Sequence, residues 1–127
     1  MNDKLFVYGT LLDEENRYGI YLRDNSHFYA KGKLKGKLYH LGEYPGATIG
    51  GDDFIYGVIV QMDNPAEALA LIDIYEGFGD EQPQPNEFIR VITEAETASG
   101  PVACWIYLYN WPAVEDKLII GGMYFKQ

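Results

Sequence analysis

Glu76 is the residue whose position in this sequence best suits proton transfer. It lies on one predicted helical face with Leu69, at i+7, and the predicted helix ends directly after it at Gly77. Partial burial disfavours the charged form of a carboxyl group. The negative end of the helix dipole and Asp73, one turn earlier, repel a further negative charge. All three effects raise the pKa of Glu76 toward the range in which a carboxyl group exchanges protons near neutral pH.

A second feature is needed to support a proton-transfer role for Glu76, because a glutamate near a helix C-terminus is more often a solvated residue without a function. The stretch LFVYGTLL, residues 5–12, supplies one: a buried strand breaks at a glycine. The loop Tyr8-Gly9-Thr10-Leu11 can turn several backbone N–H groups in one direction, because Gly9 has no side chain to obstruct them. Such a concavity binds a carboxylate or oxyanion without a basic residue. The two features together predict an anchor for an anionic substrate with a base beside it.

The helix that carries Glu76 is the most clearly predicted element. Asn64 suits the N-cap, Pro65 suits the first helical position, and Glu67 follows the cap by three residues. Gly77 suits a left-handed stop. Residues 13–29 show no pattern that assigns them to helix or strand.

Most of the remaining chain is predicted to form short strands. Gly57, inside one of them, suggests a bulge or a close backbone approach. TASG is typical of a hairpin turn, and Pro45 with Gly46 predicts another turn. One long helix among about five strands favours a mixed sheet or small barrel over a doubly wound parallel sheet. The predicted strands lie in residues 4–8, 30–40, 54–62, 87–96 and 101–111.

Composition excludes several classes of partner. The 127 residues carry 10 Lys plus Arg against 19 Asp plus Glu, a net charge of −9, which disfavours nucleic acids and anionic membranes. Lys31, Lys33, Lys35 and Lys37 alternate along one strand and share a face. That face is either an anion-binding stripe or a solvated strand surface, and the general behaviour of lysine favours the second.

Cysteine and histidine usage favours a cytoplasmic protein without a metal. Cys104 is the only cysteine, so no internal disulfide can form, and its apolar surroundings favour a buried structural thiol. His27 and His40 have no cysteine partner with which to form a metal site. Neither histidine is at a recognisable position to activate Thr10 as a nucleophile. No signal peptide, membrane-length apolar run or nucleotide-binding motif is evident.

An ordered set of motifs resembles the gamma-glutamylcyclotransferase-like family. In chain order the motifs are FVYGTLL, GKLYHLGEYPGA, IYGVIVQMD, ALIDIYEG, NEFIRVIT and IIGGMYF. The resemblance covers nearly the whole chain, taken as a single domain of residues 1–127. It implies an α+β fold, a small mixed β-barrel with one main packed helix and short flanking helices. Phe88 departs from the tyrosine often found before the arginine strand, and the loop FGDEQPQPNE is long and acidic.

The resemblance also implies an activity and its residues. Tyr8, Gly9, Thr10 and Leu11 would form the substrate-binding loop, and Glu76 would be the catalytic residue, without cofactor or metal. The implied enzyme releases 5-oxoproline and a free amine from a gamma-glutamyl amine, when the α-amine of the substrate attacks its own γ-carbonyl. The alternative is a non-catalytic small-ligand binding or regulatory module on the same fold, because a fold alone does not establish an activity.

Overall fold

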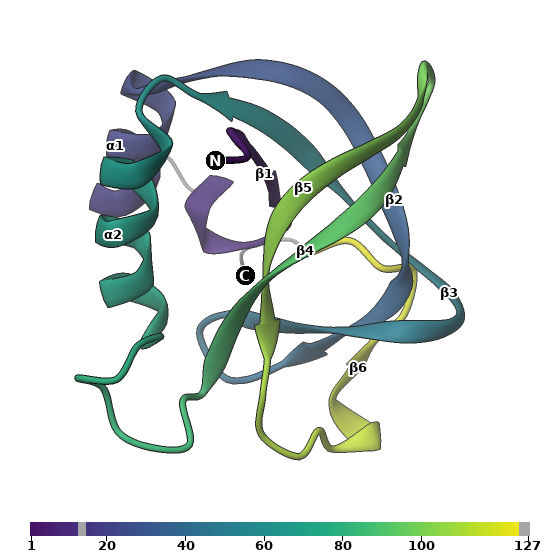
Figure 1. The fold of residues 1–127 in the computed structure, drawn as a ribbon. Helices are drawn as coiled ribbons and strands as arrows, with labels where there is room; N and C mark the ends of the chain where they lie inside the picture. The colour runs from purple at the N-terminus through teal and green to yellow at the C-terminus, as the bar shows by residue number, and fades with distance from the viewer. Residues whose placement is uncertain (13–14, 125–127) are drawn as a thin grey trace.

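A strongly curved sheet and two helices make up the protein (Figure 1). The computed structural model describes residues 1–12 and 15–124, with only the backbone of Thr10. Residues 13 and 14 of the unassigned segment and Phe125 of the IIGGMYF motif lie outside the described residues. The helices are α1 (Arg17–Asp24) and α2 (Pro65–Glu76), with short 3-10 helices at Thr10–Leu12 and Glu115–Lys117; the strands are β1 (Lys4–Val7), β2 (Ser26–His40), β3 (Pro45–Met62), β4 (Phe88–Thr97), β5 (Gly100–Tyr109) and β6 (Leu118–Ile119).

The strands close into a ring, which confirms the predicted α+β class with a mixed barrel. Their order is β3-β1-β5-β4-β2-β6, and a further pairing of β2 with β3 closes the ring. The β1–β5 pair is parallel and the other pairs are antiparallel, so the sheet is mixed. Both helices lie side by side on one side of the barrel (Figure 1).

Strand β1 is buried on both faces, which explains its continuous apolar sequence. Phe6 and Tyr8 belong to the core inside the barrel, together with Ile59 and Ile106. The alternate residues Leu5 and Val7 belong to a second core between the barrel and the helices, which also contains Leu69 and Ile72 of α2, Leu22 of α1 and Met62. The period of two along β1 therefore ties the barrel to the helix that carries Glu76.

Helix α2 begins and ends as the sequence predicts. The Asn64 side chain accepts a hydrogen bond from the Glu67 N–H, and Pro65 occupies the first turn. Gly77 has a φ of 74°, a left-handed conformation that glycine adopts without strain, and its N–H closes the last turn. Helix α1, inside the unassigned segment, has an equally local cap, since the Asn16 side chain accepts from two backbone N–H groups.

The turn predicted at Pro45 and Gly46 is wrong by a few residues. Both residues pair with β2, opposite His40 and Tyr39, and so belong to β3. The connection lies just before them, where the Leu41 N–H donates to the carbonyl of Tyr44. Pro45 begins the strand, a position at which a missing N–H is tolerated.

Two other predictions about the strands agree with the structure. Thr97 pairs with Gly100 across the predicted hairpin turn. A Cβ atom on Gly57 would lie 2.8 Å from the Phe6 ring and 2.5 Å from the carbonyl oxygen of Val7, so Gly57 allows a close approach of β1. On β2, Leu34 and Leu38 are buried, while the lysines between them are partly or fully exposed.

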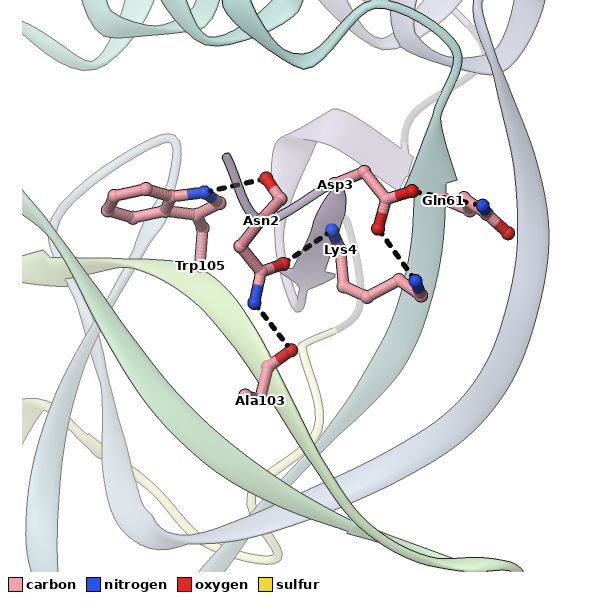
Figure 2. Close-up of polar contacts among 6 residues, drawn as sticks. All are labelled: Asn2, Asp3, Lys4, Gln61, Ala103 and Trp105. Atoms are coloured by element: carbon pink, nitrogen blue, oxygen red, sulfur yellow. Dashed lines mark hydrogen bonds and ion pairs between the residues drawn. The ribbon is translucent and has the colours of Figure 1, made fainter.

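The chain before β1 is anchored to strands on both of its sides (Figure 2). The Asn2 side chain donates to the carbonyl of Ala103 at 2.9 Å, and the Trp105 indole donates to the carbonyl of Asn2 at 3.0 Å. Asp3 points the other way and accepts from the Gln61 side chain of β3 at 3.0 Å. These bonds fix the start of β1, and therefore the position of the loop that follows it.

Candidate active site

A cavity of about 160 Å³ opens where the end of β1 meets the end of α2. The start of β3 with the residue before it, the start of β4 with the residue before it, and one residue of β5 form the rest of its wall. It brings Tyr8, Gly9 and Leu11 together with Glu76, as the sequence predicts. The other lining residues are Phe6, Val7, Tyr44, Pro45, Tyr75, Glu87, Phe88 and Tyr107.

The Glu76 carboxyl group lies in this cavity without a polar partner. Among the described residues it makes no hydrogen bond and no ion pair. Its pKa is raised from 4.5 to about 8, first by burial, then by the negative charges of Glu87 and Asp73. The predicted direction of the shift is confirmed, and two of its three predicted causes, burial and Asp73, are among those found.

Glu87 is the site residue that sequence reasoning missed. Its side chain lines the cavity, and one carboxylate oxygen, Oε2, accepts a hydrogen bond from the Tyr44 hydroxyl at 2.5 Å. The backbone carbonyl of Glu87 accepts from the Asn110 N–H at 2.7 Å, which fixes the start of β4 to the end of β5. A signal was present, because Glu87 ends the acidic loop and directly precedes a strand. Only the barrel closure, however, brings it to Glu76.

Asp73 differs from Glu76 because a cation neutralises it. Arg90 of β4 donates two hydrogen bonds to its carboxylate, at 2.8 and 3.0 Å, and the Tyr107 hydroxyl donates a third at 2.6 Å. Both partners of this ion pair are mostly buried. The Arg90 guanidinium also lies over the Trp105 ring, 4.3 Å from its centroid. The pair therefore ties the last turn of α2 to the barrel, and both carboxylate oxygens of Asp73 are engaged in hydrogen bonds.

The buried hydroxyl group of Tyr8 fixes the start of the loop after β1 to β5. The Tyr8 hydroxyl donates to the backbone carbonyl of Tyr107, and burial raises the pKa of Tyr8 well above its ordinary value. The Leu12 N–H donates to the carbonyl of Gly9 at 3.0 Å, closing the short helix that begins at Thr10. In the part of the chain that the structure describes, the N–H groups of Gly9 and Leu11 have no hydrogen-bond partner. They are available to an anionic group.

Gly9 lies close to Pro45, and both residues line the cavity. A Cβ atom at this position would lie 2.8 Å from Cγ and 3.2 Å from Cδ of Pro45. Its φ lies outside the left-handed region, so the requirement for glycine is one of space rather than of backbone conformation. A side chain here would have to displace the loop from Pro45.

Comparison with known proteins identifies the family. A model of the gamma-glutamyl cyclotransferase, AIG2-like family matches residues 5–126. The chain belongs to this family. It is 29% identical over 126 residues to the gamma-glutamylcyclotransferase family protein YtfP of Escherichia coli K12, covering 94% of this chain and 93% of that protein. It is also 29% identical over 107 residues to the gamma-L-glutamyl-butirosin B gamma-glutamyl cyclotransferase of Niallia circulans, covering 84% of this chain and 66% of that protein.

Solved structures share the fold. YkqA from Bacillus subtilis superposes with a TM-score of 0.68 at 23% identity, over 98% of this chain and 40% of that one. A structure of a gamma-glutamyl cyclotransferase superposes with a TM-score of 0.61 at 19% identity, over 84% of this chain and 66% of that one. The family's barrel with packed helices is therefore the fold of this chain.

The remaining chemically active side chains lie away from the cavity. Cys104 is fully buried, and burial raises its pKa to about 11. His27 pairs with Asp63 at 3.1 Å on the surface, and His40 is exposed. No helix within residues 1–12 and 15–124 is both long enough and apolar enough to cross a bilayer.

The raised pKa of Glu76 predicts how stability depends on pH. The folded protein holds the Glu76 proton more tightly than the unfolded chain, because its pKa is about 8 rather than 4.5. The contribution of this bound proton to the free energy of unfolding is fully present below about pH 4.5 and is lost as the pH rises through 8. Glu76→Gln cannot ionise, so its free energy of unfolding should lack this decline. At about pH 9 the variant should be more stable than the parent protein by on the order of a few kcal/mol.

Urea denaturation across this pH range measures the difference directly. Glu94→Gln, at an exposed position of β4, removes the same charge and should leave the slope of the parent protein unchanged. Parallel curves for the parent and Glu76→Gln would contradict a raised pKa at Glu76.

Proposed function

We propose that this protein is a gamma-glutamyl cyclotransferase that releases 5-oxoproline and a free amine from a gamma-glutamyl amine. The observation that carries the proposal is the unpartnered Glu76 carboxyl group, whose pKa of about 8 suits it to exchange protons near neutral pH. Membership of the family and the match over residues 5–126 support both the reaction class and a single catalytic domain.

In the proposed reaction the substrate's α-amine attacks its own γ-carbonyl carbon. A carbon–nitrogen bond forms to close a five-membered lactam, and the bond between that carbon and the amide nitrogen breaks. Glu76 takes the proton that the attacking nitrogen loses and delivers it to the leaving nitrogen, so that the carboxylate is regenerated. Because the reaction is intramolecular, holding the substrate folded removes much of its entropic cost. No cofactor takes part in this scheme.

The loop after β1 would bind the anionic part of the substrate. The unpartnered N–H groups of Gly9 and Leu11 suit the α-carboxylate or the oxygen of the reacting carbonyl. Tyr8 would position this loop, because the hydrogen bond from its hydroxyl to the carbonyl of Tyr107 holds the loop against β5. Thr10 would contribute its backbone, since it begins the short helix.

The name of one relative supports the substrate class. The Niallia circulans protein is named as a gamma-glutamyl cyclotransferase of gamma-L-glutamyl-butirosin B. This supports a gamma-glutamyl amide as the substrate of the present chain. The cavity volume of about 160 Å³ suits the glutamyl group, with the amine portion extending toward the entrance.

Replacing Glu76 by glutamine tests the catalytic role. The amide keeps the size of the side chain but cannot accept and return a proton, so 5-oxoproline release should fall by about 10²- to 10⁴-fold. Affinity for 5-oxoproline should change little. Chromatographic detection of 5-oxoproline, calorimetric titration and a thermal midpoint, all on the same sample, separate the outcomes. Unchanged turnover would contradict the catalytic role, and a parent protein that binds without turnover would favour the regulatory alternative.

Replacing Gly9 tests the backbone anchor. Gly9→Ala places a methyl group against Pro45, so the loop must shift and the affinity for 5-oxoproline should fall by about tenfold or more. Gly32→Ala, which faces the flexible end of Ile59 in the barrel, is the matched control and should retain affinity. Calorimetry measures both variants, and equal affinities would contradict the anchor.

A further inference from the structure

The cavity wall has an imbalance of charge that the proposed reaction does not use. Two carboxyl groups, Glu76 and Glu87, line it, whereas none of the described lining residues is a lysine or arginine. The nearby cation Arg90 is already paired with Asp73 through two hydrogen bonds. Because Glu76, with a pKa of about 8, is mostly protonated at neutral pH, a ligand that fills this cavity meets chiefly the carboxylate of Glu87, without a neutralising cation.

Aromatic rings form most of the rest of the wall. Tyr8, Tyr44, Tyr75, Phe88 and Tyr107 all line the cavity. Aromatic faces together with carboxylates are the surroundings that bind ammonium groups best, because the ring quadrupole and the fixed charges act in the same direction. The cavity thus combines a backbone anion site at Gly9 and Leu11 with a wall suited to a cation.

Glu87 is placed to serve this cation without giving up its structural role. Only its Oε2 atom accepts from the Tyr44 hydroxyl, and within the described residues its Oε1 atom has no hydrogen-bond donor. Glu87 itself is partly exposed and lines the cavity, so its side chain lies between the cavity and solvent. The amine portion of a bound substrate would leave the cavity on such a side.

We propose that Glu87 is a specificity-determining residue that selects gamma-glutamyl amides whose amine portion carries a second, positively charged nitrogen, such as a diamine acylated at one end. The proposal rests on the proposed function for the identity of the glutamyl group. Glu76 handles the proton of the reaction, and Glu87 binds the ammonium group that does not react. The net charge of −9 attracts such substrates at long range.

A matched pair of substrates isolates this role. Gamma-glutamyl-diaminobutane ends in an ammonium group, and gamma-glutamyl-n-pentylamine has a methyl group in its place. The ratio of their kcat/KM values cancels any effect that Glu87 exerts through the proton affinity of Glu76, since both share the reacting atoms. We expect the parent protein to prefer the charged substrate by about ten- to hundredfold, and Glu87→Gln to bring the ratio close to one.

Two further measurements keep the outcome clear. Glu43→Gln removes the same charge from an exposed residue beside Tyr44, outside the cavity, and should keep the preference. Calorimetry on Glu76→Gln, with and without Glu87→Gln, compares the dissociation constants of both intact substrates without turnover.

The outcomes of the two methods are distinguishable. If neither substrate yields 5-oxoproline, the proposed function fails, and the binding preference alone decides the role of Glu87. A parent protein that treats both substrates equally, binds neither of them, or keeps its preference in Glu87→Gln would overturn the proposal.

Discussion

The central constraint on this site is an unfavourable one: the carboxyl group of Glu76 is buried close to the carboxylate of Glu87. Glu76 has no polar partner among the described residues, and burial with the charge of Glu87 holds its pKa near 8. A folded chain tolerates such a group only when the surrounding structure fixes it there. The same conditions that lower stability at alkaline pH give the side chain a proton affinity suited to proton exchange near neutral pH.

The scaffold meets this condition by tying the end of α2 to the barrel. Apolar contacts of Leu69 and Ile72 with the outer face of β1 secure one side of the helix. The ion pair between Asp73 and Arg90 secures its last turn, and Gly77 ends the helix directly after Glu76. The same strand, β1, continues into the loop at Gly9, so the end of α2 and this loop are both positioned by one strand.

Local sequence signals predict two parts of this arrangement, the helix that carries Glu76 and the loop at Gly9. The caps at Asn64 and Gly77 and the face shared by Leu69 and Glu76 depend on residues within a few turns of one another. The break at Gly9 is equally local. The position of Glu87 depends on β4 closing the ring with β5 and β2, pairings between distant segments that no local pattern specifies.

For the same reason, the sequence predicts Asp73 only as a like charge one turn from Glu76. Its neutralising partner, Arg90, lies 17 residues away on another element. Long-range pairing therefore decides that the Asp73 carboxylate has a cationic partner, whereas the Glu76 carboxyl group has none among the described residues. A carbon-13 NMR titration of the Glu76 carboxyl carbon, assigned with Glu76→Gln, tests that account most directly. An apparent pKa near 8 is the predicted result, and a value near 4.5 would contradict it.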